Sequence, residues 1–270
     1  MLFQTTVAGK FVFDTERPID ISIRLIFDGD QPNAFGVETA RARPCEAGAL
    51  VGDTRRGGSC NFEQITLIPH CNGTHTECVG HITNERISVI DCIKDVMVPA
   101  LLASVAPEAL EAGEAPEAYP FSLTSEDRLI TRSVLERKIG DNHDAKALIV
   151  RTLPNDDSKL TRRYGDEIPP FFSTEAMEFI VECGFEHLLV DLPSIDRTVD
   201  GGQLSNHRIF WNVAPGSFET NPDSRINSTI TELIYVPDSV PDGEYLLNLQ
   251  IAPFASDASP SRPVLFKRIG

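Results

Sequence analysis

Long hydrophobic runs are missing from this chain of 270 residues. No stretch approaches the ~18 uninterrupted apolar residues that a helix needs to cross a bilayer. Residues 1–10 also lack a basic segment followed by an apolar run, which is the pattern of a secretory signal. These absences argue against a membrane protein, and we expect a cytoplasmic location.

Basic residues are scarce relative to acidic ones. The chain has 24 Lys and Arg against 40 Asp and Glu, which gives a net charge of -16 and a pI near 4.7. A nucleic-acid backbone or an anionic membrane surface would repel such a protein at long range. We therefore expect no nucleic-acid or membrane partner, and a small molecule as the ligand.

The composition is otherwise that of a globular protein. With 41% hydrophobic residues, a chain of this length can bury one large core, so we predict a single domain over residues 1–270. A chain of this size does not need disulfides and carries no signal for export, so its six cysteines are expected to be reduced thiols. No internal repeat is present.

Short β-prone segments between turn residues indicate a strand-rich protein of the α/β or α+β class. Strands are predicted over residues 19–27, 65–68 (within the segment 61–69), 145–151, 187–191, 230–236, 245–252 and 263–267. Residues 123–139 are a helix candidate, and the polar connection 156–170 is of the kind that often lies over an active site.

One helix has clear boundaries. Ser173 is a good N-cap, apolar residues recur at helical spacing from Ala176 to Cys183, and Gly184 is a good C-cap. Together with the strands predicted over 145–151 and 187–191, this helix forms a βαβ unit, whose two strands should be parallel.

Residues 70–81, with the sequence HCNGTHTECVGH, gather three imidazoles, two thiols and a carboxylate. These are ligands that zinc, manganese and iron prefer, so the segment predicts a divalent-metal site. In an extended chain Cys71, His75 and Glu77 project to one side and His70 to the other, which favours Cys71 as a co-ligand. In a helix His75 and Glu77 would point about 200° apart. We therefore expect an extended segment that turns into a helix near Gly80.

The segment matches neither the His-Glu-x-x-His spacing of zinc proteases nor a zinc-finger cysteine pair. A bound divalent metal nevertheless polarises a carbonyl and lowers the pKa of a bound water towards neutrality. Hydrolysis of an amide, ester or lactam would then need no nucleophilic side chain.

The segment resembles the signature of the cyclase-like metal-dependent hydrolases, which include bacterial kynurenine formamidase and isatin hydrolase. That signature reads His-x-Gly-Thr-His-x-Asp-x-Pro-x-His. Here residues 73–75 match Gly-Thr-His and His81 matches the final histidine. Cys71 stands for the first histidine, Glu77 for the aspartate and Val79 for the proline.

Further similarities follow in the same order along the chain. Residues 191–196, DLPSID, are similar to the family's Asp-x-x-Ser-hydrophobic-Asp element, and residues 204–208 resemble the segment of a later ligand histidine. Residues 231–233 resemble the family's glutamate segment, and residues 19–22 and 261–264 are similar to its first and last strands.

The resemblance implies a strand-rich α/β domain of the swivelling β/β/α type. It also implies a divalent metal, one or two ions, and a homo-oligomer, a dimer or larger. The implied metal ligands are Cys71, His75, Glu77, His207 and Glu232. His81 would be the general acid/base, and Glu77 would bridge two ions and so take part in catalysis. Asp191, Ser194 and Asp196 would support the loop beneath the ligands.

The substitutions bear on the metal and on activity. A thiolate at Cys71 softens the site and favours zinc over manganese, while His70 could replace Cys71 through a local bulge. We expect a hydrolase that opens an amide-type carbon–nitrogen bond in an arylformamide or a cyclic amide. One alternative is a family member with weak or no catalysis that binds a metal or small ligand. Another is a redox protein using Cys71 and Cys78.

Overall fold

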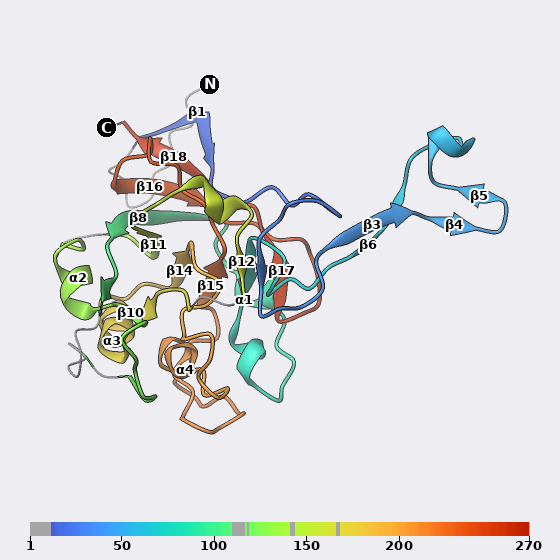
Figure 1. The fold of residues 1–270 in the computed structure, drawn as a ribbon. Helices are drawn as coiled ribbons and strands as arrows, with labels where there is room; N and C mark the ends of the chain where they lie inside the picture. Colours follow the sequence, from blue (N-terminus) through green and yellow to red (C-terminus); the bar gives the residue numbers. More distant parts are fainter. Residues whose placement is uncertain (1–11, 110–116, 118, 141–143, 166–167, 270) are drawn as a thin grey trace.

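The structure is a computed structural model that describes residues 12–109, 117, 119–140, 144–165 and 168–269. A curled mixed sheet of nine strands forms its centre, in the order β1-β18-β16-β8-β11-β14-β15-β7-β17 (Figure 1). The strands of this sheet are β1 (Phe13–Asp20), β7 (His75–Glu77), β8 (Met97–Val105), β11 (Ala147–Thr152), β14 (His187–Val190), β15 (Thr229–Glu232), β16 (Gly243–Asn248), β17 (Ala258–Pro260) and β18 (Val264–Arg268).

Smaller pieces surround this sheet. The helices are α1 (Val89–Cys92), α2 (Arg132–Glu136), α3 (Thr174–Glu182) and α4 (Ser205–Trp211), with 3-10 turns η1 (Thr54–Arg56), η2 (Val79–Ile82) and η3 (Asp157–Leu160). The remaining short strands are β2 (Asn33–Ala34), β3 (Arg41–Pro44), β4 (Glu46–Ala47), β5 (Leu50–Val51), β6 (Glu63–Thr66), β9 (Glu108–Ala109), β10 (Arg128–Ile130), β12 (Arg163–Tyr164) and β13 (Phe171–Phe172).

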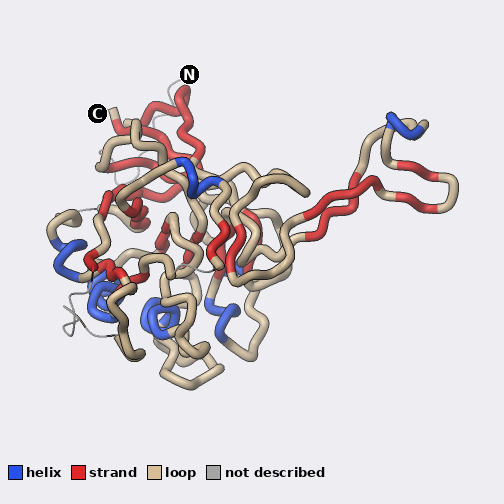
Figure 2. Tube along the Cα trace, viewed as in Figure 1, coloured by secondary structure: helices blue, strands red, loops and turns tan. Residues whose placement is uncertain are grey.

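The core lies on both faces of the parallel strands β8, β11, β14 and β15. Because side chains alternate along a strand, β11 gives Leu148 and Val150 to one apolar cluster and Ala147 and Ile149 to the other. The first cluster includes residues of α2, α3 and α4, which Figure 2 shows on one side of the sheet. Burial on both faces explains the apolar runs Ala147–Val150 in β11 and Leu188–Val190 in β14.

The predicted βαβ unit is confirmed. The Ser173 hydroxyl accepts a hydrogen bond from Ala176 N at 3.0 Å, and α3 ends before Gly184, whose φ is +81°. β11 and β14 are parallel neighbours with Ala147 opposite His187. Strands at β6, β15, β16 and β18 also agree with the sequence prediction.

Two predicted elements are wrong. The first strand is β1, which ends at Asp20, and beyond it only a single bridge joins Ser22 to Ile234. The helix expected over 123–139 shrinks to α2, because residues 128–130 pair with β9 and β13 and the Thr131 hydroxyl caps the helix from within the segment.

An arm formed by residues 41–66 extends away from the body of the molecule (Figure 1). It contains the antiparallel pairs β3–β6 and β4–β5. Only Gly52 and Asp53 are buried in it, and Leu50 and Ile65 are 52% and 50% exposed.

Candidate metal centre

The site begins with β7, which lies between β15 and β17 and is buried at all three residues. Gly73, with φ +134°, turns the chain into this strand. The Thr74 hydroxyl then donates to Leu233 O at 2.5 Å and accepts from Ile23 N at 2.8 Å. This Gly-Thr step therefore fixes where His75 and Glu77 enter the core.

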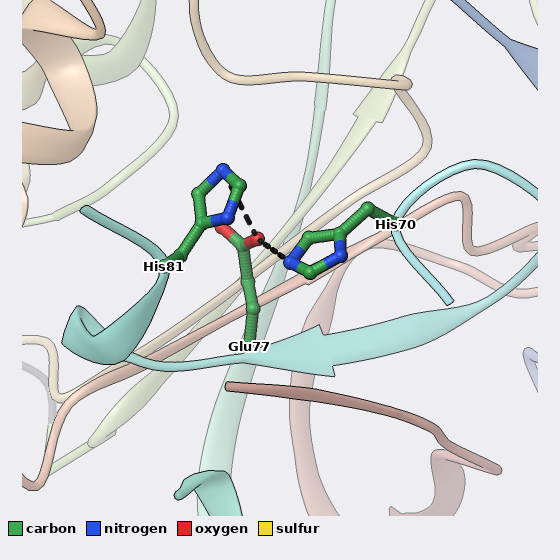
Figure 3. Close-up of side chains that lie close together, drawn as sticks. All are labelled: His70, Glu77 and His81. Carbon is green, nitrogen blue, oxygen red and sulfur yellow. Dashed lines mark ion pairs between the residues drawn. The ribbon is translucent and has the colours of Figure 1, made fainter. Parts of the chain in front are cut away.

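Glu77 lies at the centre of the site, with a 1% exposed side chain. Its Oε1 is 3.0 Å from His207 Nε2. Its Oε2 is 3.4 Å from His70 Nε2 and 3.9 Å from His81 Nε2, as the dashed lines of Figure 3 show. Burial alone would raise the pKa of Glu77, but the rings of His81 and His207 outweigh it and hold this pKa well below its usual range. Glu77 is thus a carboxylate surrounded by imidazoles.

His75 faces a second carboxylate. Its Nδ1 donates to Gly73 O at 2.9 Å, which leaves Nε2 directed at Glu232 Oε2, 3.5 Å away. Burial lowers the pKa of His75, but Glu232 and Glu77 outweigh this effect and raise it. The buried Nε2 makes no hydrogen bond of acceptable geometry. Buried polar atoms are normally hydrogen-bonded, so a buried imidazole nitrogen without a partner is a candidate metal ligand.

Two donor sets of three residues meet at Glu77. The ligand atoms of His75, Glu77 and Glu232 lie within 4.8 Å of one another, and so do those of His70, Glu77 and His81. Imidazole nitrogens and carboxylate oxygens gathered this closely suit zinc or manganese. The residues present therefore fit a divalent metal.

His207 reaches the site from α4. Its Nδ1 is 2.6 Å from Asp196 Oδ2, so Nε2 is turned towards Glu77. Burial lowers the pKa of His207, but Asp196 and Glu77 raise it well above its usual value. Ser194 Oγ in turn accepts from Asp196 N at 3.1 Å. Asp196 and Ser194 thus lie behind His207, on the side of the ring away from Glu77.

Cys71 and Asp191, which the sequence also assigned to the site, lie outside both donor sets. Cys71 is buried and belongs to neither donor set. Burial, with the charge of Glu232, raises the pKa of its thiol to about 11. Asp191 accepts hydrogen bonds from Thr152 N and Oγ1, both at 2.9 Å, and from Lys159 Nζ at 2.7 Å. These hydrogen bonds join Asp191 to Thr152 and Lys159, and none of them goes to a predicted metal ligand.

His70 belongs to a donor set because the chain before Gly73 is not extended. Cys71 N and Asn72 N both donate to Ile68 O at 3.0 Å, so the backbone turns there. The alternation argument, which put His70 on the side away from Glu77, is wrong for this reason. The helix expected near Gly80 is the 3-10 turn η2.

Sequence reasoning missed Asp257, whose Oδ2 is 3.0 Å from His70 Nε2 and 3.5 Å from His81 Nδ1. It precedes β17, which pairs with β7 although about 180 residues separate them. No local motif marks it. Cys78 packs with Cys92 and not with Cys71, so the structure offers no Cys71–Cys78 pair for a redox role.

A family model described as putative cyclase matches residues 17–197, more than half of the chain. The chain belongs to this putative cyclase family. The cyclase-family chain is 26% identical over 254 residues to a kynurenine formamidase of Bacillus thuringiensis (strain Al Hakam), covering 93% of this chain and 95% of the relative. It is also 26% identical over 258 residues to a kynurenine formamidase of Bacillus mycoides (strain KBAB4), covering 93% and 98%.

Solved structures with the same fold include isatin hydrolase A from Labrenzia aggregata, with a TM-score of 0.59, 14% identity and coverage of 93% of both chains. A predicted metal-dependent hydrolase from Bacillus stearothermophilus has a TM-score of 0.58 at 15% identity, covering 93% of this cyclase-family chain and 98% of its own. The resemblance inferred from residues 70–81 and the strand-rich α/β class are confirmed. No helix in the described ranges is long and apolar enough to span a membrane.

Proposed function

We propose that this chain is a metal-dependent hydrolase that opens an amide-type carbon–nitrogen bond by means of an activated water. The observation that carries the proposal is the pair of donor sets that share the buried Glu77. The relatives named kynurenine formamidase and isatin hydrolase support a small-molecule substrate, either an arylformamide or a cyclic amide.

The roles of the ligand residues follow from where they lie. His75, Glu77 and Glu232 would hold the ion, and His207, kept in place by Asp196, would complete the site. When bound, the ion supplies Lewis acidity to the carbonyl and lowers the pKa of a water. Cys71 is an additional ligand only if its thiol loses the proton that burial favours.

The proton-transfer role falls to His81. Its side chain is 28% exposed, whereas that of His75 is 0% exposed, so His81 can meet a substrate that His75 cannot reach. His81 Nε2 takes a proton from the attacking water and delivers it to the leaving nitrogen. The carbon–oxygen bond forms and the carbon–nitrogen bond breaks, so that one water is added overall.

Zinc is the proposed ion, with manganese as the alternative, because both donor sets contain imidazole and Cys71 lies close enough to Glu232 that burial and this charge together raise the pKa of its thiol. One ion is proposed, in the buried set of His75, Glu77 and Glu232, because His81 of the other set is assigned to proton transfer and stays unligated. Elemental analysis of protein purified without added metal should find about one zinc ion per chain, whereas two ions would fill the set of His70, Glu77 and His81 as well and contradict the proton-transfer role of His81.

The central test combines metal content and turnover in three histidine variants. The substrates are the formamide of kynurenine and isatin, with and without a chelator. His75→Ala should lose metal and turnover, while His81→Gln should keep its metal and lose about 10²–10⁴-fold in kcat. His187→Gln changes a buried histidine outside the site and should keep both. Turnover that survives complete removal of metal would contradict the proposal, and tightly held metal without turnover would favour the binding-protein alternative.

A homo-oligomer is also proposed, and the arm of residues 41–66 supports it. An isolated two-stranded hairpin is marginally stable in water, and this one exposes Leu50 and Ile65. It carries four arginines against three acidic residues in a chain of charge -16, so the body of a second copy is complementary to it.

Light scattering after gel filtration tests this assembly. The wild type should be a dimer or larger, and Leu50→Asp with Ile65→Asp should produce monomers. Val199→Asp, which changes a 62% exposed residue outside the arm, should leave the mass unchanged. A monomeric wild type at micromolar concentration would refute the assembly.

The proposed cytoplasmic location can be tested by fractionating cells that express the protein.

A further inference from the structure

Asp257 is held rigidly at the edge of the site. Its carbonyl oxygen accepts from Cys78 N at 3.0 Å, and the preceding Ser256 O accepts from Val89 N at 2.8 Å. The next residue, Ala258, is opposite Glu77 in the pairing of β17 with β7. The backbone therefore fixes the position from which the Asp257 carboxylate reaches the imidazoles.

The charge of Asp257 is met by two histidine rings. In the described part of the chain its ion-pair partners are His70 and His81, and its Oδ1 accepts a hydrogen bond from Ser256 Oγ at 3.2 Å. Both of these histidines belong to the donor set that shares Glu77. The ion pairs of Asp257 therefore point into the site.

His81 lies between two carboxylates. Its Nδ1 is 3.5 Å from Asp257 Oδ2, and its Nε2 is 3.9 Å from Glu77 Oε2. The ring of His70 stacks on it, with centroids 4.4 Å apart and planes at 27°. A carboxylate at one ring nitrogen decides which tautomer is present and which nitrogen is free to exchange protons.

We propose that Asp257 is the positioning residue of His81: it accepts the Nδ1–H and so presents the lone pair of Nε2 to the reaction site. The inference rests on the proposed function, in which Nε2 carries the proton from the attacking water to the leaving nitrogen. Asp257 stays ionised throughout and stabilises the imidazolium formed between those two transfers. His70 Nε2 is 3.0 Å from the same Oδ2, and the His70 ring packs against one face of the His81 ring.

The first experiment does not depend on turnover. Ring nitrogen NMR on the metal-loaded protein, with the His81 signals identified by their loss in His81→Gln, should show a single tautomer protonated at Nδ1. In Asp257→Asn the His81 signals should move to the other tautomer or to a mixture. Asp242→Asn removes a carboxylate that contacts Ser104 and Arg151, and should leave the His81 signals in place.

The second experiment measures the consequence for catalysis. Asp257→Asn should lower kcat about 10–100-fold with KM and metal content unchanged, and Asp257→Glu should recover part of the loss. Loss of metal from Asp257→Asn would overturn the proposal by making Asp257 a ligand. Unchanged His81 signals would overturn it by leaving Asp257 a structural role. If the wild type hydrolyses no amide, the proposed function fails, while the tautomer measurement still decides the role of Asp257.

Discussion

Two aspartates that follow β14 have different neighbours in the fold. Asp196 contacts the ring of His207, and its carboxylate also accepts from the backbone N–H groups of Asn206 and His207. Asp191 is paired with Lys159, whose side chain is 3% exposed, and is tied to the end of β11 through Thr152. Both belong to the DLPSID segment, yet only Asp196 supports a proposed ligand.

Substituting each aspartate should separate these roles. Asp196→Asn should weaken divalent-metal binding by about 10–100-fold, because the hydrogen bond that orients His207 loses its charge. Asp191→Asn should leave metal affinity unchanged but lower the free energy of unfolding by about 3–5 kcal/mol, since it strands a buried ammonium. Competition with a chromophoric chelator measures the affinity, and urea unfolding measures the stability. Equal losses of affinity in both variants would contradict the assignment.

At the residue scale, the sequence predicts the site best where the backbone itself requires particular residue types next to the metal-binding side chains. Gly73 and Thr74 are needed for the turn and for the hydrogen bonds that fix His75, so their identity marks the site. His70 and Asp257 could not be placed in this way. A turn that depends on Ile68 O brings His70 in, and Asp257 reaches the site by strand pairing, which no local pattern encodes.

At the scale of elements, the sequence predicted the helices and strands that are specified by their own capping residues and apolar patterns. α3 has its cap at Ser173 and its apolar face on one side, and most residues of β11 and β14 form short apolar runs. β8 was not predicted, although it is central, because Pro99 and its alanines are weak strand formers. Pairing with β11 and β16 on either side overrides that weakness.

The pairing of β14 with β15 predicts a dependence of stability on pH. His187 Nδ1 is 2.8 Å from Thr229 Oγ1 across these strands, and burial lowers the pKa of His187 to about 4. The unfolded chain has the ordinary histidine value near 6.5 and so binds the proton first as the pH falls. The stability due to the neutral ring is complete above pH 6.5 and is lost between 6.5 and 4, by about 2 kcal/mol at pH 5.

Urea unfolding of wild type and His187→Gln at pH 7 and pH 5 measures this effect. Carboxylates titrate in both proteins, so the difference between their pH dependences isolates His187. Stability should fall less for His187→Gln than for the wild type between the two pH values. Identical slopes would show that His187 is protonated as easily in the folded protein as in the unfolded chain.

At the scale of the whole molecule, the site exists only when distant elements meet. β7 supplies His75 and Glu77, β15 supplies Glu232 and α4 supplies His207. The order of the sheet, which puts β7 between β15 and β17, brings them together. Spacing within residues 70–81 could predict a metal, but the complete donor sets needed the topology. The same assembly gathers carboxylates that repel one another until a cation or protons compensate them.

Metal removal should therefore destabilise the entire fold. An ion that binds only the folded protein adds about 2.7 kcal/mol of stability at ~100 times its Kd. For a chain of this size that corresponds to a fall of roughly 5–10 °C in Tm when a chelator strips the ion. Scanning calorimetry of wild type before and after chelation, and after zinc is restored, makes the measurement. His75→Ala keeps the fold but loses one donor of the buried set, so its Tm should be nearly insensitive to chelator and zinc. A wild-type Tm that ignores both would mean that these carboxylates are balanced by protons alone, and that the buried donor set is not an ion site.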